Sequence, residues 1–192
     1  MSKYQTISGV SEGFYKEKGS KFYAFAVPCK TEEEAKTYLN NYRKSHPQAV
    51  HVCYAFRFGS DKKVFRASDD GEPSNSAGPP ILGQIQSFDL TNILIAVVRY
   101  YGGTNLGVGG LIQAYRTAAK EALENAQVID QEDEQLLELN FKYEQLPVIM
   151  KVIKDHSCTI IEQIFDNQCF MKVSFPVSNL MLREQINELI KE

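Results

Sequence analysis

Glycine is distributed unevenly along this chain, and that asymmetry constrains the possible folds more than any other feature. All 12 glycines of the 192 residues lie between Gly9 and Gly110. Glycine serves where a backbone turns sharply or approaches another segment closely, so the first part of the chain needs such places and the remainder does not. We therefore expect two domains, residues 1–130 and 131–192, with the polar run 130–135 as a solvated linker between them.

Charge divides along the same line. Residues 1–130 hold 15 Lys and Arg against 13 Asp and Glu, whereas residues 131–192 hold 6 against 11. The first domain, with its small positive excess, is therefore the better candidate for an anionic partner. The whole chain has a net charge of -3, so it lacks the basic excess of a dedicated duplex-DNA binder.

Composition excludes several classes of protein. Hydrophobic residues at 43% and charged residues at 23% are typical of a globular protein. There is no apolar signal segment at the N-terminus and no run of about 18 apolar residues that could span a bilayer, so we predict a cytoplasmic protein with no membrane partner. The four cysteines show no C-x-x-C spacing, which favours free thiols. We expect neither a metal nor a cofactor.

Periodicity predicts alternating strands and helices in the first domain. Aromatic and β-branched residues favour strands at 20–27, 51–58 and 64–67, and the continuous apolar run 92–98 is typical of a strand buried on both faces. Thr31, with Glu34 three positions later, predicts the start of a helix that ends at His46 and Pro47. Further helices are expected over 79–85 and 111–123.

The second domain has the element order of a split β-α-β unit. We expect strand 135–143, helix 146–156, strands 158–165 and 168–175, and helix 180–190, with a hairpin turn at Asp166 and Asn167. Strand, helix, two strands and helix is most of a ferredoxin-like fold, in which helices cover one face of a small antiparallel sheet. Only the last strand is absent.

A glycine-rich junction between the strand at 92–98 and the helix at 111–123 is the sharpest functional feature. Unpaired N–H groups at a helix start and glycines that let a ligand approach favour phosphate or carboxylate binding. The segment has no Walker lysine and no G-x-G-x-x-G pattern. A tight turn whose glycines only permit positive φ is the structural alternative. The candidate residues are Arg99, Tyr101, Gly102, Gly103, Asn105, Gly107, Gly109, Gly110, Gln113 and Arg116.

Three further groups of residues allow two interpretations each. Asp69, Asp70 and Glu72 could hold Mg²⁺ or transfer protons, or could close a turn and pair with Arg66 or Arg99. His51, like the other two histidines, has no partner spacing of a triad and is read as a helix-end or core residue. Aromatic and basic side chains could together form a stacking surface for single-stranded RNA or belong to the core: Tyr100, Tyr101, Tyr115, Arg57, Arg66, Arg99 and Arg116.

Several separated motifs, in order, resemble the IMPACT/YigZ family. They are Lys18-Gly-Ser-Lys-Phe22, His46-Pro-Gln-Ala-Val-His51 with Cys53-Tyr-Ala-Phe56, Asp69-Asp-Gly-Glu-Pro73 with Ala77-Gly78, and Val98-Arg-Tyr-Tyr-Gly-Gly103 through Leu106-Gly-Val-Gly-Gly-Leu111. The resemblance implies an α+β fold: an N-terminal domain of the ribosomal protein S5 domain 2-like type, and a small ferredoxin-like domain similar to domains of translation elongation factors. Eukaryotic members of the family are regulators of translation.

Two positions depart from the family pattern. Asn105 stands where relatives usually carry lysine, and Gln113 stands where many carry arginine. Both changes remove positive charge beside the expected anion site, while Arg99 and Arg116 retain it.

Three functions follow as hypotheses. The leading one is a non-enzymatic binding module that engages RNA, the ribosome or a translation-associated protein through its N-terminal domain. An alternative is an enzyme acting on a phosphorylated small molecule or nucleotide held by the glycine-rich segment, with Asp69, Asp70 or Glu72 binding Mg²⁺ or accepting a proton. The third is a purely protein-binding adaptor. The sequence predicts no particular oligomeric state.

Overall fold

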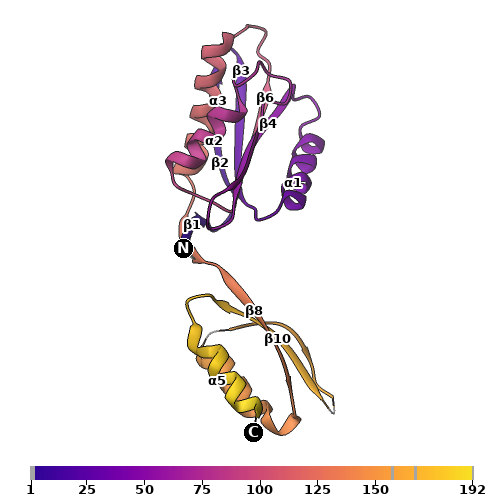
Figure 1. Cartoon of the computed structure of the whole chain (residues 1–192). Coiled ribbons are helices and arrows are strands. Elements are labelled where there is room, and N and C mark those ends of the chain that lie inside the picture. The colour runs from indigo at the N-terminus through magenta and orange to yellow at the C-terminus, as the bar shows by residue number, and fades with distance from the viewer. Residues whose placement is uncertain (1–2, 157, 167, 192) are drawn as a thin grey trace. The chain divides into compact units, whose positions relative to one another are not determined.

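The computed structural model describes residues 3–156, 158–166 and 168–191 (Figure 1). It divides into two compact units, Lys3–Gln131 and the residues from Glu132 onward. The predicted α+β fold class is confirmed, since each unit packs helices on an antiparallel sheet. Among the described residues, no helix is long and apolar enough to cross a bilayer.

A five-stranded antiparallel sheet forms the centre of the first unit, in the order β2-β3-β6-β4-β5. Its strands are β2 (Ser11–Glu17), β3 (Ser20–Pro28), β6 (Ile93–Tyr100), β4 (His51–Phe58) and β5 (Val64–Ser68). The four strands predicted from the sequence are all present, whereas β2 was not predicted. The apolar run of β6 lies in the middle of the sheet and is buried from Ile93 to Arg99, as expected for a strand covered on both faces.

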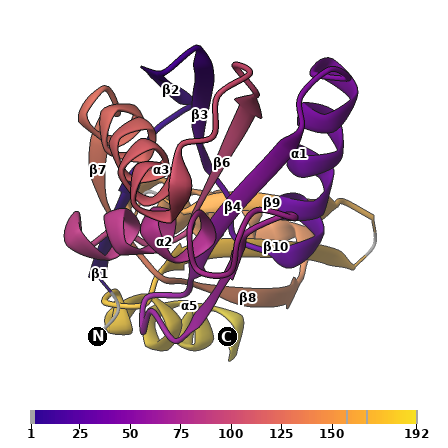
Figure 2. The ribbon, with the colours of Figure 1, turned by 90° about the horizontal axis from the view of Figure 1, so that it is seen from above.

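Helices cover both faces of this sheet (Figures 1 and 2). Helix α1 (Glu32–Ser45) packs on one face, while α2 (Gly78–Ser87) and α3 (Gly107–Glu124) pack on the other. Thr31 caps α1 as predicted, its Oγ1 accepting the amide of Glu34 at 3.2 Å. The Glu34 carboxylate bonds the amide of Lys30 rather than that of Thr31, so the predicted capping box is only half formed.

Helix α3 starts four residues earlier than the sequence indicated. Gly107, Gly109 and Gly110 belong to its first turn and not to the preceding loop. Glycine disfavours helix interiors, but intrinsic propensity is a weak guide that packing overrides. Here Leu111, Ala114 and further buried side chains of the same helix hold it against the sheet.

The remaining strands of the first unit pair residues from opposite ends of its sequence. β1 (Lys3–Ile7) and β7 (Val128–Glu132) form a two-stranded sheet. Neither was predicted. The polar run 130–135 holds the end of β7, Asp133 and the start of β8 (Glu134–Phe141), and the boundary between the two compact units falls within it. Backbone pairing stabilises the extended conformation even where the side chains are polar.

The second unit is a three-stranded sheet covered on one face by two helices. Strands β8, β10 (Cys169–Pro176) and β9 (Thr159–Ile164) lie in the order β8-β10-β9, all antiparallel. A short 3₁₀ turn (Tyr143–Gln145) leads into α4 (Leu146–Asp155), and α5 (Leu180–Lys191) follows β10. This strand order is the ferredoxin-like split β-α-β predicted from the sequence. The expected turn at 166 and 167 includes position 167, which lies outside the described residues.

Candidate functional site

The acidic loop between β5 and α2 is built around Asp69. One oxygen of its carboxylate, Oδ1, accepts the amides of Ala77 and Gly78 at 2.9 and 2.8 Å, and the other, Oδ2, accepts that of Asn75 at 2.8 Å. Since the first amides of a helix have no partner within the helix, Asp69 supplies partners for the start of α2. Of the two roles that the sequence allows for the acidic loop, metal or proton chemistry and closing a turn, Asp69 has the second.

Asp70 joins this loop to the sheet and to α1. Its Oδ2 accepts the amide of Val52 at 2.7 Å, and its Oδ1 is 2.7 Å from the guanidinium of Arg43. Its carbonyl accepts a hydrogen bond from Nδ1 of His51 at 2.7 Å. The residue has a φ of 44° and Gly71 has a φ of 89°, so the backbone passes through two successive left-handed conformations, which glycine and aspartate tolerate better than most residues. The loop thus turns Glu72 inward.

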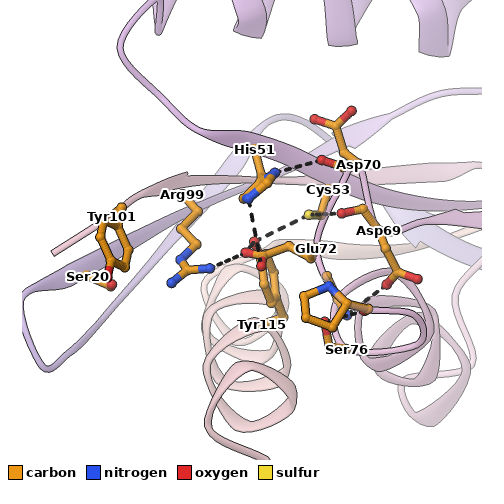
Figure 3. Close-up of polar contacts among 12 residues, drawn as sticks. Ser20, His51, Cys53, Asp69, Asp70, Glu72, Ser76, Arg99, Tyr101 and Tyr115 are labelled. Carbon is orange, nitrogen blue, oxygen red and sulfur yellow. Dashed lines mark hydrogen bonds and ion pairs between the residues drawn. The ribbon is translucent and has the colours of Figure 1, made fainter. Parts of the chain in front are cut away.

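Glu72 is the centre of a buried polar cluster (Figure 3). Its Oε1 lies 2.5 Å from a guanidinium nitrogen of Arg99 and accepts the hydroxyl of Tyr115 at 2.7 Å. Its Oε2 is 3.8 Å from Nε2 of His51. The side chains of Glu72 and Arg99 are only 3% and 7% exposed, and Tyr115 is fully buried. Buried charges need such pairing, because an uncompensated one is very costly.

Cys53 extends the cluster into the sheet. Its thiol lies 3.0 Å from the carbonyl oxygen of Asp69 and 3.3 Å from the Tyr115 hydroxyl. Burial raises the pKa of the Tyr115 hydroxyl, and it also raises the pKa of the Cys53 thiol. Both groups therefore stay protonated in ordinary conditions and act as hydrogen-bond donors, not as a nucleophile and its base.

Arg99 is held on its other side by aromatic rings. Its guanidinium carbon lies 5.5 Å from the ring centroid of Phe22 and 5.6 Å from that of Tyr101, distances at which a cation is attracted by a ring face. Phe22 belongs to the core and Tyr101 is 49% exposed. Arg99 thus connects the buried cluster to the surface where β6 ends.

The glycine-rich segment is exposed directly after this point. Gly102 lies against the hairpin between β2 and β3, where a Cβ on it would come within 2.0 Å of the carbonyl carbon of Gly19. Its amide donates to Ser20 Oγ at 3.1 Å. Gly103 and Gly107 have φ values of 85° and 71°. Close approach and positive φ therefore explain these three glycines, whereas Gly109 has no neighbour within 4 Å of where its Cβ would be.

The polar side chains around this segment face solvent. Asn105 Oδ1 accepts the hydroxyl of Tyr101 at 3.2 Å, and Gln113 donates to Thr117 one helical turn later at 3.1 Å. Arg116 is also exposed. The N-terminus of α3 has no side-chain cap. The structure thus exposes these candidates along the segment and α3, with Arg116 lining a pocket beside α2, whereas Glu72 and Arg99 are buried.

The stacking surface considered from the sequence is not assembled as such. Tyr115 lies in the core, and Arg57 is buried, donating to the carbonyl of Leu90 at 2.6 Å. Arg66 pairs with Glu32 at 3.2 Å. The core interpretation is therefore the correct one for Tyr115, and of the aromatic residues considered only Tyr101 lies on the exposed surface of the glycine-rich segment.

Tyr115 and Cys53 belong with Glu72, although the sequence did not indicate it. The three are contributed by α3, β4 and the loop, so no local pattern relates them. Among the described residues, no group of three or more His, Cys, Asp or Glu is placed to hold a metal ion.

Comparison with known proteins places these residues in a family. The Impact N-terminal domain family matches residues 18–123, which includes the buried cluster and the glycine-rich segment. The chain belongs to the IMPACT family. In the fold, the separated motifs of the family meet around Glu72, Arg99 and the start of α3.

Relatives in the IMPACT family extend the match into the second unit. The chain is 34% identical over 167 residues to the family member YigZ of Escherichia coli, which covers 85% of this chain and 81% of that protein. It is 47% identical over 107 residues to a member from Thermus thermophilus, covering 56% of each. A yeast protein named as an IMPACT homologue is 33% identical over 96 residues, 36% of its length. The crystal structure of a hypothetical protein superposes with a TM-score of 0.79 at 27% identity, over 100% of this chain and 94% of that one.

Proposed function

We propose that this protein is a non-enzymatic binding module linked to translation, which contacts the ribosome through the first unit. Membership in the IMPACT family supports the link, since eukaryotic members regulate translation. The proposed contact surface is the exposed junction from Tyr101 to Gly110 together with Arg116. This surface presents backbone amides, an aromatic ring and a cation, which are the groups that hold phosphate and nucleotide bases.

One observation carries the preference for binding over catalysis. The polar side chains expected to do chemistry are already engaged in the fold: Asp69 at the start of α2, Asp70 on Val52 and Arg43, and Glu72 on Arg99. A general base or metal ligand needs free lone pairs directed at a substrate. The exposed candidate residues, Tyr101, the glycines, Asn105, Gln113 and Arg116, include no carboxylate that could act in this way.

Co-sedimentation with ribosomes tests the proposal. The whole chain is run through sucrose gradients with ribosomes from its own source at low and high salt, beside a Tyr101→Ala/Arg116→Ala variant. Both side chains are exposed, so the substitutions spare the core; Arg99→Ala would not, because it leaves Glu72 buried without its partner. The control is Tyr143→Ala/Lys36→Ala, which removes an exposed tyrosine of the second unit and an exposed cation of α1.

The expected result is salt-sensitive co-sedimentation that the control retains and the Tyr101→Ala/Arg116→Ala variant loses by roughly fivefold or more. Wild-type protein that stays at the top of the gradient at low salt would refute the proposal. Equal co-sedimentation of both variants would keep the ribosome as partner and refute the assigned surface.

A further inference from the structure

A second exposed surface lies on the sheet face that α1 only partly covers. Helix α1 packs over β4 and β6 on the side of the sheet opposite α2 and α3 (Figures 1 and 2). Its last turn reaches β3 through Tyr42, whose ring stacks on Phe25 with centroids 4.6 Å apart. Beyond that contact, β2 and β3 present their side chains to solvent. We call the four residues Phe14, Lys16, Lys21 and Tyr23 the hairpin face.

Strand alternation places these four side chains on one side. Glu12, Phe14 and Lys16 are exposed, whereas Gly13 lies against the backbone of α3 and Tyr15 packs on the core beneath it. In β3, Phe22 belongs to the core beneath α3, so Lys21 and Tyr23 face the other way. Register then sets Phe14 opposite Tyr23 and Lys16 opposite Lys21.

The aromatic part of the hairpin face is preorganised. The ring centroids of Phe14 and Tyr23 are 4.9 Å apart, and Phe14 is 43% exposed. Behind them, Tyr23 contacts the ring of Tyr100 edge-on at 5.9 Å, and the Tyr100 hydroxyl bonds Nδ1 of His46 at 2.7 Å. These contacts fix the rings from the core side and leave the outer face of Phe14 free.

The basic part of the hairpin face has no counter-charge within the fold. Lys16 and Lys21 are cross-strand partners, and Lys18 stands in the turn between the two strands. All three are exposed, and none of them forms an ion pair with another residue that the structure describes. Like charges directly opposite one another disfavour pairing of the strands. An anion bound between them would relieve this repulsion. The carboxylate of Glu12 lies on the same side of β2 but at the opposite end of the strand from these lysines.

We propose that the hairpin face binds single-stranded RNA. An unpaired base stacks on Phe14, which Tyr23 supports from behind, and the adjoining phosphates lie at Lys16, Lys18 and Lys21. Aromatic rings beside lysines on an open sheet are suited to single strands, because bases within a duplex already stack on one another. Ser20 and Gly19 of the same hairpin contact Gly102, so the turn of the hairpin adjoins the start of the glycine-rich segment. The inference rests on the proposed function and adds that the partner is a single strand of RNA.

Fluorescence anisotropy of a labelled ten-nucleotide single-stranded RNA, titrated with the whole chain, tests this inference. Three phosphate contacts give a salt slope of about -2, so affinity falls roughly 18-fold from 50 to 200 mM salt. Lys16→Gln/Lys21→Gln leaves one contact and a fall of about threefold. Phe14→Ala weakens binding about fivefold or more at fixed salt. The control, Lys36→Gln/Lys120→Gln, removes two exposed lysines outside the hairpin face and keeps the wild-type slope.

The competing outcomes are separable. Duplex RNA of the same length that binds as tightly would overturn the stacking assignment, and variants that bind like the wild type would overturn the surface.

If single-stranded RNA does not bind while ribosome co-sedimentation persists, the RNA inference fails and the proposed function stands. If Phe14→Ala abolishes co-sedimentation without any RNA binding by the wild type, the hairpin face docks a protein instead. Absence of both RNA binding and co-sedimentation refutes both proposals. Unchanged far-ultraviolet circular dichroism shows that each variant is folded.

Discussion

Removing the charge of Glu72 tests whether the buried cluster holds the first unit together. The substitution Glu72→Gln keeps the size of the side chain and its bond from the Tyr115 hydroxyl. It leaves the guanidinium of Arg99, 7% exposed, without the carboxylate that now lies 2.5 Å away. The loss should therefore report the uncompensated charge rather than a cavity.

The expected cost follows from that burial. Breaking a buried ion pair by neutralising one partner costs about 3–5 kcal/mol. Unfolding entropy of about 2.1 cal/mol/K per residue gives about 0.27 kcal/mol/K for a unit of about 130 residues, so the melting temperature of the first unit should fall by roughly 11–18 °C. Replacing both partners, in Glu72→Gln/Arg99→Met, removes the stranded charge and should restore most of the stability.

Urea and thermal unfolding followed by far-ultraviolet circular dichroism measure these changes. The chain contains no tryptophan, and its two units require fits that allow two transitions. Glu33→Gln, which changes an exposed carboxylate in the first turn of α1, is the control and should shift stability by no more than about 0.5 kcal/mol. A loss below about 1 kcal/mol for Glu72→Gln, or a double variant less stable than the single one, would show that this buried charge pair does not hold the first unit together.

Three further predictions concern the loop, the glycines and the thiols. Asp69→Ala removes the acceptor of three amides at the start of α2 and should cost about 2 kcal/mol in urea unfolding; an unchanged midpoint would contradict the capping role. Gly102→Ala should destabilise the first unit by about 1–3 kcal/mol, because its Cβ would meet Gly19 at 2.0 Å. Gly109→Ala should instead stabilise the unit by about 0.5 kcal/mol, because Gly109 lies in the first turn of α3 with open space around it. Thermal melts in which Gly109→Ala is the less stable variant would show that the roles of the two glycines are wrongly assigned. Burial raises the pKa of Cys29 to about 11, and the thiolate is the reactive form. The rate of iodoacetamide labelling of Cys29, measured by mass spectrometry, should therefore be low near pH 8 and increase about a hundredfold by pH 10. Labelling of Cys29 at pH 8 as fast as that of the partly exposed Cys158 would contradict this prediction.

Much of the fold could be predicted because its signals are local. The apolar run of β6, the capping threonine of α1 and the successive strands and helices of the second unit each leave a pattern within a few residues. β2 left no such pattern, because Gly13 stands in its middle. A Cβ there would come within 2.4 Å of the α3 backbone, so the glycine is required by a helix more than 100 positions later and obscures the strand in the sequence.

The candidate site divides in the same way. The glycine-rich segment is contiguous and was recognisable as a junction. The cluster around Glu72 joins residues separated by 27 and 43 positions, and only the tertiary structure reveals that Arg99 is paired and Tyr115 buried. Arg99, expected to be available to an anion, has one guanidinium nitrogen committed to Glu72. Conversely, the hairpin face had no signal, since its meaning depends on register between β2 and β3.

Sedimentation of the wild-type chain with ribosomes from its own source, at low and at high salt, tests the proposed ribosome contact most directly. We expect the protein to travel with the ribosomes at low salt and to be released at high salt, because phosphate contacts weaken as salt rises. Protein that remains at the top of the gradient at low salt would contradict the proposed contact.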